Sequence, residues 1–206
     1  MPLPKLKISR ITNLQDARYC AAEGVHFLSF SLERGYDQKL SVQTVWNIAN
    51  WLEGPAYIIE LNTFSLDELK EVSQSVSVSA ISLPIEDWAE ALWMYTDSLI
   101  LRATEDFPLE VVQDLLQKAS MQGKNLQFEI SCEQLEEVSK WEPVFPNIFL
   151  HFKDVDKTEA LINLNENYPF GISLGSEVEE APGMLDYDKT GKILSVYQEK
   201  LEMANE

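Results

Sequence analysis

Residues Leu6 to Leu32, with the sequence LKISRITNLQDARYCAAEGVHFLSFSL, contain one complete strand–helix–strand unit. Polar and apolar residues alternate from Lys7 to Ile11, as in a strand, and Asn13 can then cap a helix that Gly24 ends. A second short strand follows from His26 to Leu32. Because the turns are short, this pattern predicts a right-handed crossover between two neighbouring parallel strands.

The rest of the chain repeats this unit, each time with a short apolar strand followed by a helical pattern. The strands that we predict are Lys7–Ile11, His26–Leu32, Ala56–Asn62, Val78–Leu83, Ser98–Thr104, Asn125–Ser131, Ile148–Phe152 and Phe170–Ser176. The helical patterns include a short aromatic helix at residues 86–95 and a helix from Glu133 to Lys140. Eight such units predict an α/β protein with a single (β/α)8 TIM barrel over residues 1–206. The alternative is an open doubly wound sheet, but no GxGxxG motif follows the first strand.

Charge and composition restrict the classes of partner. The chain has 34 acidic and 16 basic residues, a formal net charge of −18, which disfavours binding to nucleic acid or to an anionic membrane surface. No apolar run approaches the ~20 residues needed to span a bilayer, and the first residues lack the apolar core of a signal peptide. We therefore expect a soluble, cytoplasmic protein whose partner, if any, is a small molecule. The sequence leaves the oligomeric state open.

The cysteine and histidine content predicts no metal site. Cys20 and Cys132 form neither a CxxC motif nor a Cys/His ligand set, so we expect two free thiols. The two histidines are too few for a metal cluster with the carboxylates spaced as here. We expect His26, which opens a strand, to be structural and His151, which lies near a strand end, to be the better functional candidate.

Both ends of the chain resemble one enzyme family. Lys7 to Ala17, KISRITNLQDA, resembles the first unit of phosphoribosylanthranilate isomerase, whose pattern reads K-I-C-G-I-T-N, then an acidic or amide residue, D and A. Gly171 to Asp186, GISLGSEVEEAPGMLD, aligns without gaps on the family pattern G-V-D-V-S-S-G-V-E-x-x-P-G-x-K-D. The resemblance implies a TIM barrel whose chemistry lies at the carboxyl ends of the strands.

The family reaction is an Amadori rearrangement of an aminoaldose to an aminoketose, which needs a general acid and a general base and no cofactor. In the family, a cysteine thiolate is the base and an aspartate that ends strand six is the acid. Ser9 stands at the cysteine position, and Glu129 is the carboxylate nearest to the aspartate position. A serine hydroxyl without an adjacent base stays protonated, so Ser9 does not simply inherit the role of the cysteine.

The family's phosphate-binding loops are also altered. In the family, the loop after strand eight and a Gly-Gly pair after strand seven hold the substrate phosphate on backbone amides. Gly175 and Ser176 match that loop, but Glu177 replaces its glycine and adds a negative charge. After strand seven the chain has no glycine, and His151 or Lys153 would have to bind an anion through its side chain.

Two further family positions carry other residues. Arg10 replaces a glycine beside Ser9, and we expect its guanidinium to pair with Glu177 and close the mouth of the barrel. Gln38 replaces the arginine that binds the anthranilate carboxylate. Other charged residues also lie at strand ends. Arg102 and Lys153 are cations that can form ion pairs with the carboxylates there, which include Glu60.

Three functions fit these observations. The first is a diverged relative of the isomerase, with weak or no isomerase activity, that serves as a non-catalytic or binding protein. The second is an active isomerase that uses Glu129 as its acid and an unidentified base. The third is a different small-molecule enzyme that uses Glu60, Glu129, Arg102 and Lys153 at the same barrel mouth.

Overall fold

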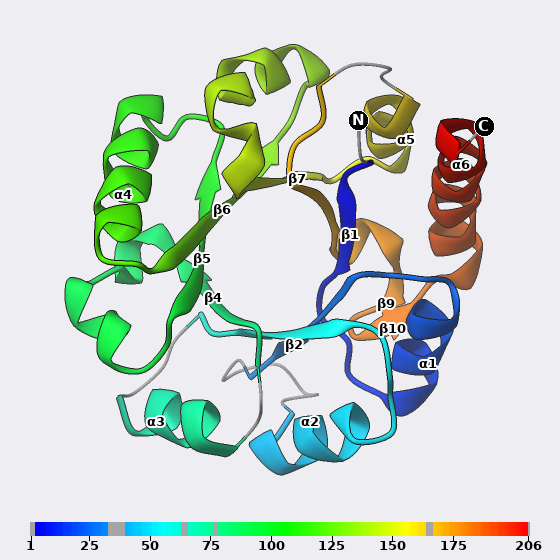
Figure 1. Ribbon diagram of the computed structural model, residues 1–206. Helices are drawn as coiled ribbons and strands as arrows, with labels where there is room; N and C mark the ends of the chain where they lie inside the picture. The colour runs from blue at the N-terminus through cyan, green and yellow to red at the C-terminus, as the bar shows by residue number, and fades with distance from the viewer. Residues whose placement is uncertain (1–2, 33–39, 63–65, 76–77, 164–166, 206) are drawn as a thin grey trace.

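The computed structural model describes residues 3–32, 40–62, 66–75, 78–163 and 167–205, and it confirms the predicted (β/α)8 barrel. Its strands pair in chain order, all in parallel, and the last pairs with the first to close the barrel. The strands are β1 (Lys5–Ile8), β2 (Phe27–Ser31), β3 (Ala56–Glu60), β4 (Ala80–Pro84), β5 (Ser98–Thr104), β6 (Asn125–Cys132), β7 (Ile148–Phe152) and β8 (Gly171–Leu174). Figure 1 shows this ring of strands with the helices outside it.

The helices lie on the outer surface of the barrel. They are α1 (Leu14–Ala22), α2 (Val42–Ala49), α3 (Leu66–Ser75), α4 (Leu109–Met121), α5 (Val155–Asn163) and α6 (Tyr187–Asn205). The Asn13 side chain caps α1 as expected, accepting a hydrogen bond from the Asp16 backbone N–H at 2.9 Å. Within the described ranges, no helix is both long and apolar enough to cross a membrane.

Two predicted helices are 3₁₀ segments instead. Residues 86–95 fall mostly in the 3₁₀ turns η1 (Ile85–Asp87) and η2 (Glu90–Met94), and the predicted helix at Glu133–Lys140 is replaced by η3 (Leu135–Asn147). Pro143 and Pro146 lie inside η3. Because proline lacks the backbone N–H and crowds the preceding turn, the two prolines prevent a regular α-helix in the second half of η3.

The barrel interior is closed at the amino-terminal end of the strands. Outside the strands a large apolar core packs against the helices, whereas inside the barrel a small separate cluster contains Ile58, Ala80, Ile100, Phe149, Phe27 and Phe170. Gly171 makes room for this cluster, because a Cβ at Gly171 would lie 2.4 Å from the Phe149 ring. We call this cluster the aromatic plug, after its three phenylalanines. The polar interior on its other side opens toward the carboxyl ends of the strands.

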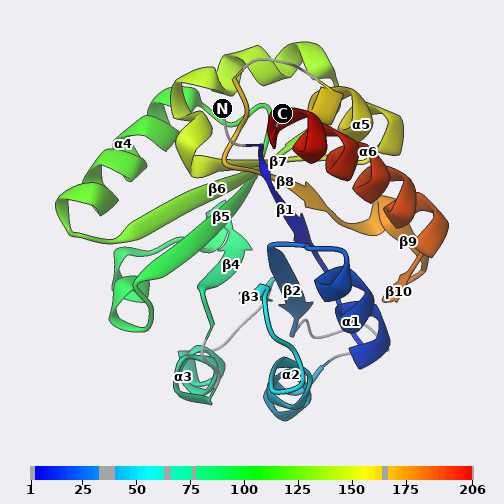
Figure 2. The same ribbon diagram turned by 45° about the vertical axis from the view of Figure 1, so that its right-hand side comes forward.

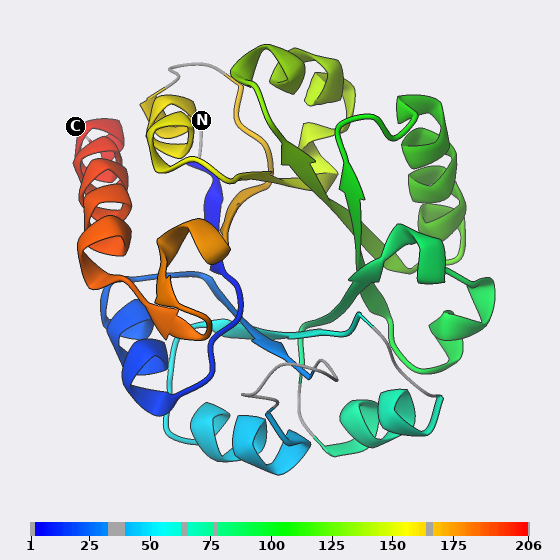
Figure 3. The same ribbon diagram turned by 180° about the vertical axis from the view of Figure 1, so that it is seen from behind.

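A hairpin after β8 covers part of the outer surface. It contains η4 (Ser176–Val178), β9 (Glu179–Ala181) and β10 (Met184–Leu185), and it lies between α1 and α6 in Figures 2 and 3. Asp16 of α1 holds it in place, since its carboxylate accepts from Leu185 N at 3.1 Å and from Tyr187 Oη at 2.6 Å. The hairpin follows the end of β8 directly, and thus helps to form the rim of the barrel mouth.

Candidate functional site

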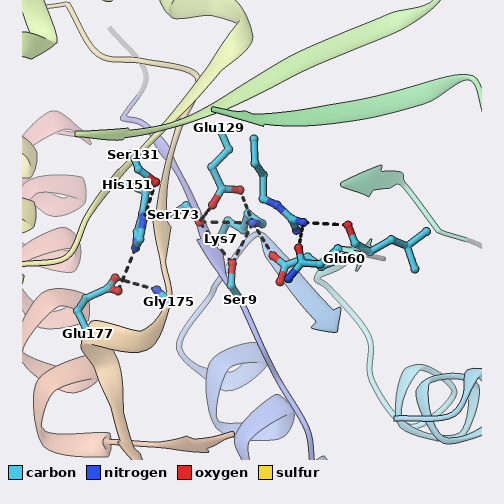
Figure 4. A network of polar contacts seen from close by, with 12 residues as sticks. Lys7, Ser9, Glu60, Glu129, Ser131, His151, Ser173, Gly175 and Glu177 are labelled. Atoms are coloured by element: carbon cyan, nitrogen blue, oxygen red, sulfur yellow. Dashed lines mark hydrogen bonds and ion pairs between the residues drawn. The ribbon is translucent and has the colours of Figure 1, made fainter. Parts of the chain in front are cut away.

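A buried lysine, Lys7, lies at the centre of the barrel. The side chain is fully buried, and Nζ lies 2.9 Å from Glu60 Oε1 of β3 and 2.5 Å from Glu129 Oε2 of β6. Nζ also donates to Ser9 Oγ at 2.9 Å and lies 3.4 Å from Ser173 Oγ of β8. Figure 4 shows this one cation joining side chains from distant parts of the chain.

The two carboxylates keep Lys7 charged. Burial lowers the pKa of Lys7, but the charges of Glu129 and Glu60 and their hydrogen bonds outweigh it, and the net pKa is raised above 10.5. Burial likewise raises the pKa of Glu60, but the charges of Lys7 and Arg102 lower it to about 2. The pair is therefore ionised at neutral pH, and Lys7 is an ammonium ion with no tendency to act as a base.

Ser9 lies beside this ammonium ion. Its hydroxyl accepts from Lys7 Nζ and lies 3.5 Å from Ser173 Oγ, which in turn donates to Glu129 Oε1 at 3.0 Å. Both oxygens of Glu129 thus accept hydrogen bonds, one from Lys7 and one from Ser173. The Ser9 hydroxyl is next to a cation and a hydroxyl, neither of which removes a proton at neutral pH.

Arg102 of β5 holds the end of the neighbouring strand β3. One of its guanidinium nitrogens donates to the Leu61 carbonyl at 2.9 Å and to the Asn62 side-chain oxygen. The charge of Arg102 also contributes to the low pKa of Glu60. The sequence predicts an ion pair at this strand end, whereas the direct partners of Arg102 among the described residues are a backbone carbonyl and a side-chain amide.

A second polar group forms at β7 and the loop after β8. Glu177 folds back so that Oε1 accepts from the Gly175 backbone N–H at 2.7 Å, while Oε2 lies 3.0 Å from His151 Nε2. The side chain of Glu177 is only 2% exposed. His151 Nδ1 lies 3.2 Å from Ser131 Oγ of β6. Although burial lowers the pKa of His151, the hydrogen bond and charge of Glu177 raise it overall, which favours an imidazolium–carboxylate pair.

The expected ion pair between Arg10 and Glu177 is wrong. Arg10 Nε lies 3.3 Å from Glu179 Oε1 in β9, and Glu177 pairs with His151 instead. The Arg10 backbone is left-handed, with φ at 61°. This conformation suits the glycine of the family pattern and costs an arginine about 1 kcal/mol.

A cavity of about 270 Å³ occupies the barrel mouth. Its lining brings together most of the predicted site residues, namely Ser9, Arg10, Glu60, Arg102, Glu129, His151, Gly175 and Ser176, along with Asn62 and Ser131. Glu129 faces inward, and so it lies on the functional side of β6. The sequence therefore placed the residues in one mouth, although it misassigned several of their partners.

One predicted site residue, Lys153, lies away from this cavity. Lys153 is exposed and lines a separate cavity of about 290 Å³, because β7 ends at Phe152 and Lys153 already belongs to the turn before α5. Gln38 lies outside the described residues. In the part of the chain that the structure describes, no group of three or more His, Cys, Asp or Glu side chains is placed to hold a metal ion.

Lys7 is the residue that sequence reasoning missed. The signal was present, because side chains alternate along a strand and Lys7 is two positions before Ser9, so the two share the inward face. A lysine in a strand is ordinarily assigned to the solvent face. Only the closed barrel brings Glu60 and Glu129 to the same point and makes the buried cation acceptable.

Comparison with known proteins supports the fold. Neither a family model nor a curated protein matches the chain. A solved phosphoribosylanthranilate isomerase in complex with reduced 1-(o-carboxyphenylamino)-1-deoxyribulose 5-phosphate is 16% identical, with a TM-score of 0.78 over 96% of this chain and 100% of that one. The phosphoribosylanthranilate isomerase of Thermotoga maritima is 16% identical, with a TM-score of 0.73 over 97% and 99% of the two chains.

A different enzyme shares the same fold. The phospho-2-dehydro-3-deoxyheptonate aldolase of Thermotoga maritima is 14% identical, with a TM-score of 0.71 over 98% of this chain and 69% of that one. At these identities the likeness establishes the barrel fold that the resemblance predicted. The function has to be argued from the side chains of the mouth.

Proposed function

We propose that this chain is a diverged relative of phosphoribosylanthranilate isomerase that binds a small molecule at the barrel mouth and has lost the isomerase reaction. The observation that carries the proposal is the position of the Glu177 carboxylate. Glu177 lies in the loop that corresponds to the family's phosphate site. Its carboxylate accepts a hydrogen bond from the Gly175 amide of that loop and pairs with His151 of β7. An internal anion thus occupies the donors that a substrate phosphate would need.

The loss of this donor set matters for rate as well as for affinity. Remote phosphate contacts supply binding energy that orients the reacting carbon. A phosphate entering here would have to displace a carboxylate that is 2% exposed and already has two partners. Its own negative charge would then lie next to that of Glu177.

The acid–base groups also fail to support the reaction. The Ser9 hydroxyl accepts from a lysine that its carboxylate partners keep protonated, so Lys7 cannot take the serine proton. Glu129 accepts hydrogen bonds on both oxygens, whereas a general acid must donate one to the substrate. Each missing group costs a factor of ~10²–10⁴ in rate.

A second candidate is a different small-molecule enzyme. It is favoured by the two carboxylates, Glu60 and Glu129, and the guanidinium of Arg102 around one open cavity. These groups can orient a polar substrate, but Glu60 and Glu129 are held by Lys7, and Lys153 does not reach the mouth. The geometry therefore supports binding of a small molecule at the mouth more directly than it supports a catalysed reaction there.

Complementation of a tryptophan auxotroph that lacks the isomerase tests the proposal. We expect no growth with the unaltered chain and none with Ser9→Cys, because Glu177 still fills the phosphate loop. A genuine isomerase expressed from the same vector is the positive control, and immunoblotting confirms equal protein levels. Growth with the unaltered chain at ordinary expression would refute the proposal and support an active isomerase.

A further inference from the structure

The mouth cavity opens toward the carboxyl ends of the strands. Lys7 and its carboxylate partners lie beneath it, and the aromatic plug at Phe149 closes the barrel below them. Its volume of about 270 Å³ is at or just below the small end of the range for ligand pockets, ~300–1,000 Å³. The volume of the cavity therefore suits a molecule about the size of a single sugar.

Most charged groups around the cavity have a charged partner, and Arg102, which donates to the Leu61 carbonyl and the Asn62 side chain, is balanced by the nearby charge of Glu60. Lys7 pairs with Glu60 and Glu129, as described above, and the rim carries the pairs Arg10–Glu179 and His151–Glu177. A charged ligand would have to break one of these pairs or leave its own charge unpaired. Removing one partner of a buried ion pair is strongly unfavourable, so the mouth disfavours charged ligands.

The uncharged groups of the cavity have a common chemistry. Ser9, Ser131 and Ser176 carry hydroxyls that both donate and accept, and Asn62 contributes an amide with the same property. The carboxylates of Glu60 and Glu129 supply further acceptors at the same surface. A molecule with several hydroxyl groups matches this alternation of donors and acceptors.

We propose that the mouth binds an uncharged polyhydroxyl molecule of pentose size, such as a free sugar or its alditol, and discriminates against its phosphate ester. The inference rests on the proposed function, because an isomerase of this family would need the phosphate. No aromatic side chain lines the cavity among the described residues, so an aromatic ring has no stacking partner there. Glu177 provides the discrimination, since its carboxylate holds the Gly175 amide and His151.

Isothermal titration calorimetry with matched probes tests the inference. The probes are D-ribose, ribitol, D-ribose 5-phosphate and inorganic phosphate, each up to ~10 mM, which detects a Kd near ~1 mM. We expect D-ribose or ribitol to bind and the phosphate ester to bind at least about tenfold more weakly. Ser9→Ala should weaken binding of the neutral probe about two- to tenfold, the effect of one hydrogen bond. Lys153→Ala, outside the mouth, should leave it unchanged.

A second pair of variants tests the role of Glu177. Glu177→Gly frees the Gly175 amide and His151, and Glu177→Gln removes the charge while it keeps the size and hydrogen-bonding capacity. In both, the preference for the neutral probe should shrink by about tenfold or reverse. Urea unfolding of each variant shows that the comparison is made on folded protein.

The outcomes separate this inference from the proposed function. Equal or tighter binding of D-ribose 5-phosphate by the unaltered chain would overturn the ligand class, as would failure of every neutral probe to bind. Binding that Ser9→Ala leaves unchanged would place the ligand elsewhere and also overturn it. Isomerase turnover together with a preserved preference for the neutral probe would instead refute only the proposed function.

Discussion

Replacing Lys7 with methionine should destabilise the protein strongly and should make its stability fall as the pH rises. The substitution leaves the Glu60 and Glu129 carboxylates buried without their cation. The pKa of Glu60 drops from 4.5 to about 2 in the folded protein, with Lys7 the largest of the lowering influences. Because each pKa unit is worth about 1.4 kcal/mol, this net shift, to which Arg102 also contributes, corresponds to about 3 kcal/mol of stability at neutral pH. Removing one partner of a buried pair costs a similar ~3–5 kcal/mol.

The pH dependence follows from the direction of the Glu60 pKa. A lowered pKa contributes stability that is fully present above pH 4.5 and is lost as the pH falls toward 2. In the unaltered protein, the contribution of Glu60 to stability is therefore the same at pH 5 and at pH 7. In Lys7→Met the same carboxylate keeps the charge of Arg102 but loses the stronger influence of Lys7, so its pKa rises and the folded state takes up a proton. The variant should therefore be less stable at pH 7 than at pH 5.

Urea unfolding followed by tryptophan fluorescence at both pH values measures the effect. Lys118→Met is the matched control, because Lys118 pairs with Asp114 on the surface of α4 with its side chain 64% exposed, and it should cost below about 1 kcal/mol. A variant that adds Glu60→Gln and Glu129→Gln to Lys7→Met should recover most of the loss. A loss below about 1 kcal/mol at pH 7, or an equal loss at pH 5, would refute the account of Lys7.

Two further predictions concern buried residues of the barrel, one through a substitution and one through chemical labelling. Gly171→Ala should lower the free energy of unfolding by ~1–3 kcal/mol, since the new methyl group would lie 2.4 Å from the Phe149 ring and 2.7 Å from the Lys5 carbonyl; an unchanged melting temperature would contradict the close contact. Cys20 and Cys132 should resist a thiol reagent at pH 8 in the folded protein, because burial raises the pKa of each to about 12, and both should react after unfolding in urea; rapid labelling of native protein would show that the thiols are accessible.

The fold was predictable because its signals are local. Alternation along the strands and the helix cap at Asn13 depend on neighbouring residues, and these predictions were confirmed. The error at η3 was also local, since Pro143 and Pro146 lie just beyond the predicted helix and disfavour its continuation. β7 has the predicted bounds, Ile148–Phe152, yet Lys153, the next residue, lines a separate cavity, so a correct strand boundary did not place this side chain in the mouth.

The partners of the charged residues were not predictable in the same way. Lys7 lies 53 residues from Glu60 and 122 from Glu129, and no local pattern joins them. The partner of Arg10 depends on a left-handed backbone and on a hairpin that begins near Glu179. Such pairs depend on how the strands are arranged around the barrel axis. The sequence pattern predicts how many strands there are, but not which of their side chains meet.

The reach of Lys7 also bears on how the chain folds. Its contacts to Glu60, Glu129 and Ser173 span 53, 122 and 166 residues, so the ammonium ion finds its whole set of partners only after most of the polypeptide has been brought together. Contacts of such long sequence separation carry a large loop-closure cost and form late. An incomplete barrel would hold this cation in water, and a fragment ending before β6 would lack one of its two counter-ions. We therefore expect dehydration of the lysine to accompany the closing of the barrel, when β8 meets β1.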